Sequence, residues 1–178
     1  MKLILIDGGP ASGKNTLGKL LVDQFNKNGE KAILLDLDSY VEEFNPKWIW
    51  ESKEQEEKDH LNARVNFVKD INKYLQEDLT VVAIGERFLT HSDVSRYTEK
   101  LGINYPIYLF HLTVPRALRQ QRLDQRGPHS LINLDKDQKD RDAIKDWPGY
   151  VYENINSPEE DAKNLYDLIR SNKGLINL

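Results

Sequence analysis

The chain of 178 residues contains no cysteine, a single methionine and three tryptophans. Without cysteine, neither a disulfide framework nor a zinc site built on thiolates can form. No stretch approaches the roughly 18 apolar residues of a membrane-spanning helix, and the apolar run 3–6 is too short for a signal peptide. These absences predict a cytoplasmic protein that does not enter a membrane.

An excess of positive charge is also lacking. The chain has 25 basic and 29 acidic side chains, which gives a formal net charge of −4. An acidic chain lacks the broad positive field that supports non-specific binding to a polynucleotide, although a local basic groove is compatible with this charge. We therefore expect a small-molecule partner rather than a nucleic acid.

Apolar strand-like runs alternate with helical patterns, which is typical of a parallel sheet with crossover helices. We predict five strands, over about 2–7, 31–36, 80–85, 105–112 and 149–154. Gly29 fits the end of the first helix, and Ser157 followed by Pro158 fits the start of the last. The length fits one α/β domain over 1–178 with three αβα layers.

Two polar segments interrupt this pattern. Residues 51–59 are crowded with charge, and we interpret them as a solvated helix face or a loop. Residues 127–148 form a connection that is long for a link between a helix and the final strand. We interpret this second segment as a lid that closes over a bound ligand.

The most informative motif is a glycine-rich turn between the first strand and the first helix. It reads Gly8-Gly9-Pro10-Ala11-Ser12-Gly13-Lys14-Asn15-Thr16. In such a turn the backbone N–H groups and the helix N-terminus bind phosphate, while the lysine reaches the β- and γ-phosphates. The spacing predicts nucleotide binding, whereas the alternative is an ordinary turn with a surface lysine.

The position after the lysine departs from the usual pattern. A serine or threonine that binds magnesium normally stands there, but this chain has Asn15, and the hydroxyl is displaced to Thr16. We therefore assign Thr16, rather than Asn15, to the metal.

Two carboxylates stand where the second strand ends, in the segment 35–39. Parallel sheets bind ligands in the crevice at this edge of their strands. We expect Asp36 to hold magnesium through water, and Asp38 to accept a proton from the hydroxyl of the acceptor. The alternative is that either residue only caps the next helix.

Further candidates follow the third strand. Glu86 can orient a metal or a substrate hydroxyl, and the guanidinium group of Arg87 suits a phosphate or a carboxylate. A structural ion pair is the alternative for these two residues. Arg64, in the helical pattern before this strand, is either a substrate contact or a surface charge.

Arginines cluster on the helix after the fourth strand. Arg119, Arg122 and Arg126 fall within about 60° of helical arc, so one face is cationic. Arg122 can lie flat on an adenine, and Arg126, at the entrance to the lid, can stabilise a phosphoryl group in transfer. Arginine–aspartate pairs on a solvated helix would instead explain Arg116 and Arg119.

The histidines and tryptophans carry a weaker signal. His111 lies in an apolar strand and is interpreted as a core histidine, whereas His91 is a candidate substrate contact. None of the four histidines has the spacing of a metal ligand. The three tryptophans are interpreted as packing residues.

These motifs together resemble the P-loop small-molecule kinases, a group that holds nucleoside monophosphate, shikimate and gluconate kinases and chloramphenicol phosphotransferase. The turn over 8–16 is similar to the adenylate-kinase loop, in which glycine replaces the usual serine or threonine and a threonine follows. Asp36-Leu37-Asp38 looks like the Asp-x-Asp of shikimate kinase, which implies metal contact and activation of the acceptor.

The second half of the chain extends the resemblance. Glu86-Arg87 is similar to the pair after the third strand in deoxynucleoside and thymidylate kinases. Val114-Pro115, followed by Arg122 and Arg126, resembles the helix that leads into the kinase lid, which implies one arginine facing adenine and one facing phosphate. The acceptor-side motifs match no single family, so the acceptor stays open.

We conclude from the sequence that the chain is an ATP-dependent phosphotransferase that uses Mg²⁺ and acts on a hydroxyl group of a small molecule. Its expected catalytic residues are Lys14, Asp38 and Arg126, and its expected substrate contacts are Asp38, Arg64, Glu86 and Arg87. A nucleoside or nucleoside monophosphate kinase is the alternative, followed by a non-catalytic nucleotide-binding protein or an ATPase. A GTPase is disfavoured because no Asn-Lys-x-Asp motif is present.

Overall fold

The computed structural model describes residues 1–101, 105–125 and 134–176. Five strands form one sheet in the order β2-β3-β1-β4-β5, and every pair of neighbours is parallel. The strands are β1 (Leu3–Gly8), β2 (Ala32–Asp36), β3 (Thr80–Ile84), β4 (Ile107–Thr113) and β5 (Tyr150–Glu153). Each predicted strand is confirmed to within two residues at its ends.

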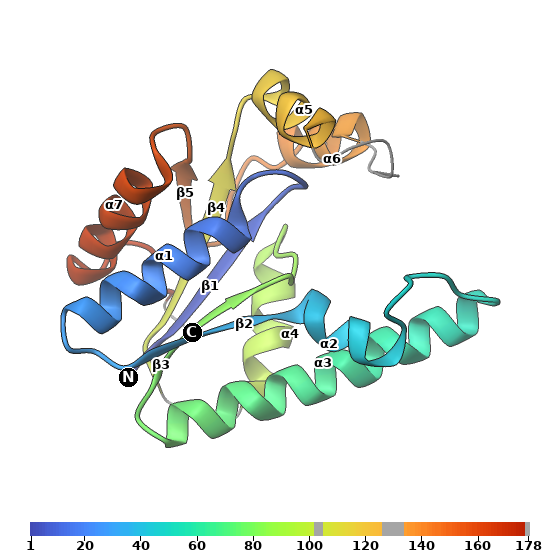
Figure 1. Cartoon of the computed structure of the whole chain (residues 1–178), viewed down its shortest axis with the longest axis horizontal. Helices are drawn as coiled ribbons and strands as arrows, with labels where there is room; N and C mark the ends of the chain where they lie inside the picture. The colour runs from blue at the N-terminus through green and yellow to red at the C-terminus, as the bar shows by residue number, and fades with distance from the viewer. Residues whose placement is uncertain (102–104, 126–133, 177–178) are drawn as a thin grey trace.

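Helices cover both faces of the sheet, which confirms the three-layer αβα fold (Figure 1). On one face lie α1 (Lys14–Lys27) and α7 (Pro158–Arg170). On the other face lie α2 (Leu37–Phe44), α3 (Lys53–Gln76) and α4 (His91–Leu101). The remaining helices, α5 (Arg116–Asp124) and α6 (Leu134–Asp142), lie together beyond the end of β4.

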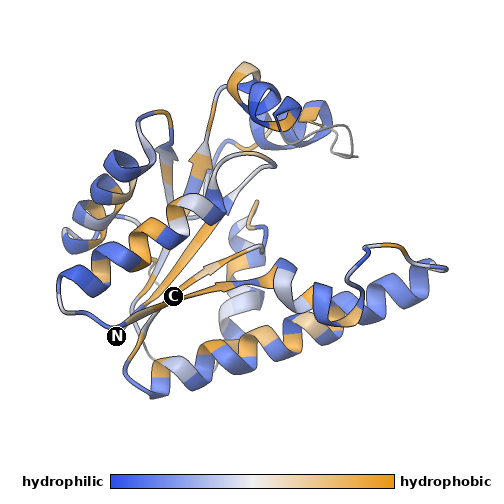
Figure 2. Ribbon diagram, in the orientation of Figure 1, coloured by the Kyte–Doolittle hydropathy of each residue, from blue (hydrophilic) through white to orange (hydrophobic). Residues whose placement is uncertain are grey.

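The central strand shows why the sheet is buried on both sides. Leu3 and Leu5 pack into the core beneath α3 and α4, whereas Ile4 and Ile6 pack into the core beneath α1 and α7. All four side chains are almost completely buried. A continuous apolar run is what a parallel strand between two helical layers requires, and Figure 2 shows the strands as largely hydrophobic.

The predicted helix ends are also found. Gly29 has a φ of 80° just after α1, and the side chain of Ser157 accepts a hydrogen bond from the backbone N–H of Glu160 at the start of α7. The charged segment 51–59 is helical from Lys53 onward, with Ser52 as the N-cap of α3. The predicted lid contains α6, but residues 126–133 lie outside the described part of the chain.

The connections at the carboxyl ends of the strands meet at one edge of the sheet. They are the turn after β1, the start of α2 after β2, the segment after β3, and the helices α5 and α6 after β4. Ligands bind at this edge in open parallel sheets. Within the described ranges, no helix has the length and apolar character to span a membrane.

Candidate active site

A cavity of about 560 Å³ opens at this edge, and all nine residues of the glycine-rich turn line it. We call residues 8–16 the P-loop. Ala11 and Gly13 adopt positive φ angles of 58° and 92°, which bend the chain into the turn. Gly13 is the N-cap of α1, but no side chain caps the helix and its first turn contains no acidic residue. The N-terminus of α1 is therefore suited to an anion.

Three side chains hold the P-loop through its carbonyl groups. Arg119 Nε donates to Pro10 O at 2.9 Å, Arg122 Nη1 donates to Ala11 O at 3.2 Å, and Asn154 Nδ2 donates to Ser12 O at 2.7 Å. These donors come from α5 and from the segment after β5, and they are not part of the cavity lining. The loop is thus anchored from its outer side.

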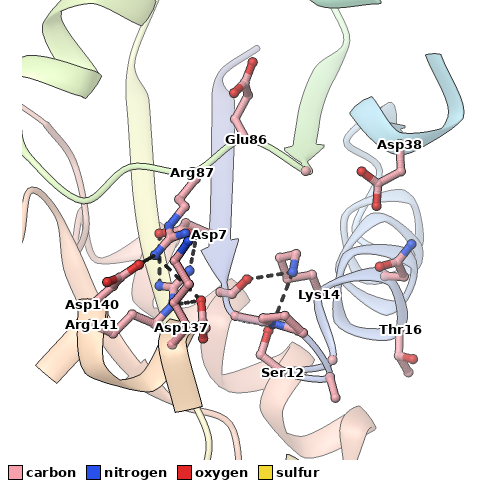
Figure 3. A pocket seen from close by; sticks show the side chains of 18 residues that line it. Asp7, Ser12, Lys14, Thr16, Asp38, Glu86, Arg87, Asp137, Asp140 and Arg141 are labelled. Carbon is pink, nitrogen blue, oxygen red and sulfur yellow. Dashed lines mark hydrogen bonds and ion pairs between the residues drawn. The ribbon is translucent and has the colours of Figure 1, made fainter. Parts of the chain in front are cut away.

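Lys14 lies at the centre of the site (Figure 3). Its ammonium group donates to Gly8 O at 2.7 Å and to Gly9 O at 3.4 Å. Burial lowers the pKa of Lys14, while Asp7 acts in the opposite direction. A lysine held across the P-loop in this way is within reach of an anion bound in the turn.

The two carboxylates after β2 have different surroundings. Asp36 is the N-cap of α2, because its Oδ1 accepts from the N–H of Asp38 at 3.2 Å, and its Oδ2 accepts from Asn15 Nδ2 at 2.6 Å. Asp36 therefore caps α2, as the alternative interpretation has it, and its contact with magnesium through water stays a prediction. Asp38 lines the cavity, and desolvation followed by the nearby charge of Asp36 raises its pKa.

Both acceptor-side candidates after β3 also line the cavity, and each forms an ion pair. Glu86 Oε1 lies 3.0 Å from Arg64 Nε, and Arg87 Nη2 lies 3.1 Å from Asp140 Oδ2. The structure thus brings Arg64 to the site through Glu86, although Arg64 is not part of the lining. The ion pairs named as the alternative are present, in contact with the cavity.

Arg119 and Arg122 of α5 share a face, as predicted, and that face lies against the P-loop carbonyl groups. Arg119 is buried and pairs with Asp137 at 2.6 Å, whereas Arg116 forms an exposed pair with Asp135. Arg122 lines a second cavity of about 290 Å³, on the other side of the P-loop, together with Gln125, Asn154, Asn156 and Pro158. Arg126 lies outside the described residues, so its predicted role stays a prediction.

Five charged residues of the cavity lining were not predicted from the sequence, and these are Asp7, Lys136, Asp137, Asp140 and Arg141. Arg141 from α6 binds both carboxylate oxygens of Asp7, at 3.0 and 3.2 Å. Burial alone would raise the pKa of Asp7, but hydrogen bonds from His111 and Arg141 outweigh burial and lower that pKa to about 2. A charged residue in the otherwise apolar strand β1 was the signal that could have revealed Asp7.

The histidines and tryptophans behave as predicted in most cases. His111 is fully buried with both ring nitrogens in hydrogen bonds, which confirms a satisfied core histidine. Trp48 and Trp50 pack against each other and against His60. His91 pairs with Asp146 at the surface. Among the described residues, no group of three or more acidic or histidine side chains is arranged to hold a metal.

Comparison with known proteins agrees with this geometry. A family model described as an AAA domain matches residues 3–148. The chain belongs to this family. No curated protein matches the sequence.

Solved structures of P-loop small-molecule kinases share the fold. A sugar kinase from Janibacter sp. HTCC2649 is 14% identical, with a TM-score of 0.65 over 96% of this chain and 95% of that one. Shikimate kinase from Acinetobacter baumannii in complex with shikimate is 23% identical, with a TM-score of 0.58 over 97% and 94%. The APS kinase CysC of Mycobacterium tuberculosis, in complex with AMPPNP and APS, is 16% identical, with a TM-score of 0.57 over 95% and 97%.

Proposed function

We propose that this protein is an ATP-dependent phosphotransferase that transfers the γ-phosphate to a hydroxyl group of a small molecule. One observation carries the proposal. A single cavity is lined by the complete P-loop with Lys14 and, from a separate helix, by Asp38, whose pKa is raised. A phosphate-binding turn facing a carboxylate that can accept a proton is the arrangement that phosphoryl transfer to a hydroxyl requires.

The donor nucleotide would lie across the P-loop. Its phosphates would meet the N-terminus of α1 and the ammonium group of Lys14, and its base would enter the second cavity beside Arg122. The guanidinium group of Arg122 could then stack on the adenine. The APS kinase structure, which shares this fold and holds AMPPNP, supports ATP as the donor.

The residues next to the P-loop also fit a magnesium ion that arrives with the nucleotide. Mg²⁺ prefers oxygen ligands and is usually held by one or two carboxylates, waters and the substrate phosphates rather than by a complete protein cage. Thr16 and Asp36 are the residues that we assign to it, with Asp36 acting through water. When bound, the ion would neutralise charge on the phosphates.

Asp38 is the group that would move the proton. The hydroxyl of the acceptor would donate its hydrogen bond to the Asp38 carboxylate and transfer its proton there as the oxygen attacks the γ-phosphorus. The bond from that phosphorus to the bridging oxygen then breaks and ADP leaves. Arg126 is proposed to stabilise the phosphoryl group in transfer, and Glu86 and Arg87 to contact the acceptor.

Replacing Asp38 with asparagine tests this proposal, because asparagine is nearly isosteric but cannot accept the proton. We expect kcat to fall roughly 10²- to 10⁴-fold while the affinity for ATP stays close to that of the wild type. The raised pKa of Asp38 also predicts that the wild type loses activity, as the pH falls, at a higher pH than an ordinary aspartate would give.

The assay would measure ATP consumption against nucleosides, sugars, antibiotics and aromatic acids. Glu43→Gln, a neutralising change at an exposed position of the same helix, is the matched control and should retain full activity. An effect of Asp38→Asn confined to KM would reassign Asp38 to substrate positioning. ATP turnover that needs no acceptor would instead identify an ATPase.

A further inference from the structure

Five buried ionisable residues form a continuous cluster between the P-loop and α6. They are Asp7, His111, Arg119, Asp137 and Arg141, and we call them the buried charge cluster. Asp137 connects its two arginines, at 2.6 Å from Arg119 Nη2 and 3.2 Å from Arg141 Nε. Arg119 in turn donates to the P-loop at Pro10 O. The cluster thus links β1, β4, α5 and α6 to the P-loop.

Both ring nitrogens of His111 form hydrogen bonds. Its Nε2 lies 2.7 Å from Pro148 O, which can only accept, so Nε2 carries a hydrogen. Its Nδ1 lies 3.0 Å from Asp7 Oδ2, and Asp7 is ionised because its pKa is about 2. His111 and Arg141 thus both contact the carboxylate of Asp7. The two carboxylates of the cluster, Asp7 and Asp137, are paired with the guanidinium groups of Arg119 and Arg141.

Arg141 is the cation of the cluster that can contact a ligand, because it lines the P-loop cavity. A guanidinium group has five N–H donors. Three of them are directed at Asp7 and Asp137, so two are not used by the contacts among the described residues. Arg141 also lines the P-loop cavity (Figure 3). The bidentate contact with Asp7 fixes the plane of the guanidinium group.

We propose that Asp7 is a positioning residue that holds Arg141 against the P-loop cavity, so that Arg141 binds the terminal phosphate of the nucleotide. This inference rests on the proposed function, because it needs a nucleotide in the P-loop. A bare carboxylate beside a phosphate site would repel the ligand. Here Arg141 binds both carboxylate oxygens of Asp7, and Lys14 lines the same cavity. Asp7 therefore orients the guanidinium group of Arg141, whose two unused donors stay available to a phosphate.

The test compares the affinities for AMPPNP and ADP, both with Mg²⁺, by isothermal titration calorimetry. Because ADP lacks the terminal phosphate, Arg141→Gln should weaken the binding of AMPPNP roughly 10- to 100-fold and the binding of ADP less than about 3-fold. Asp7→Asn should shift the same ratio in the same direction, because Arg141 loses its orientation. The exposed pair on α5 and α6 supplies the control, since Arg116→Gln with Asp135→Asn should leave both affinities unchanged.

A double variant separates positioning from stability. Asp7→Asn alone leaves the guanidinium group of Arg141 buried with one partner fewer, so the melting temperature should fall. Adding Arg141→Gln removes that charge and should recover much of the melting temperature. The weak binding of AMPPNP should persist in the double variant.

Two results would overturn this inference and leave the proposed function intact. They are a double variant that binds AMPPNP as tightly as the wild type, and an Arg141→Gln protein in which ADP and AMPPNP weaken equally. Arg141→Gln keeps the test valid if Asp7→Asn fails to fold. A wild-type protein that binds neither nucleotide would overturn the proposed function, and this inference with it.

Discussion

Replacing Gly9 with alanine would measure how tightly α6 lies against the P-loop. A methyl group at this buried position would meet the carboxylate of Asp137 and the guanidinium group of Arg119, whose Cζ would lie 3.0 Å away. Neither group is free to move aside, because Arg119 also donates to Pro10 O and Asp137 also binds Arg141. The added methyl group must therefore displace part of the buried charge cluster.

The expected loss of stability in Gly9→Ala follows from the packing. Overpacking a tight site costs roughly 1–3 kcal/mol, and loss of the Arg119–Asp137 contact would add to that cost. In a chain of this length, each kcal/mol lost from the free energy of unfolding lowers the melting temperature by about 2–4 °C. We therefore expect the melting temperature of Gly9→Ala, followed by circular dichroism, to fall by roughly 3–10 °C. Hydrogen exchange should show faster exchange of the backbone amides in α6.

Gly29 offers a matched control at the end of α1. It has a φ of 80°, but a Cβ there would meet nothing within 4 Å. Gly29→Ala should therefore cost only the backbone strain, about 1–2 kcal/mol, and leave exchange in α6 unchanged. A Gly9→Ala protein with the melting temperature of the wild type and the same exchange rates in α6 would refute the docking of α6 on the P-loop.

Two further predictions concern the nucleotide site and the buried charge cluster. Arg122→Ala should raise KM for ATP, because about 1 kcal/mol of stacking is lost, and it should leave kcat unchanged. Arg126→Ala should instead lower kcat with little effect on ATP binding. Wild-type kinetics in both variants would contradict these roles. The lowered pKa of Asp7 stabilises the folded state above its ordinary value of 3.8, and this contribution of about 2 kcal/mol is lost as the pH falls toward 2. Urea denaturation between pH 5 and 2 should therefore show a steeper loss of stability in the wild type than in Asp7→Asn, and equal slopes would count against the assignment.

The sequence by itself determined the strands, the helix ends and the P-loop. Each of these features is local. An apolar run such as 3–6 needs burial on both sides, and the backbone N–H groups of one contiguous turn bind phosphate whatever surrounds them. The same holds for Ser157, whose cap bond reaches only three residues along the chain. Such features can be recognised from spacing alone.

The tertiary structure alone decided which charges meet. Asp7 and Arg141 are 134 positions apart, and their contact depends on β1 lying between β3 and β4 with α6 folded back over the P-loop. Helical spacing placed Arg119 and Arg122 on one face, but it did not reveal that the P-loop carbonyl groups lie opposite them. Sequence periodicity reports which side of an element is buried. It carries no record of which distant element covers that side, because strand order and helix docking set those partners.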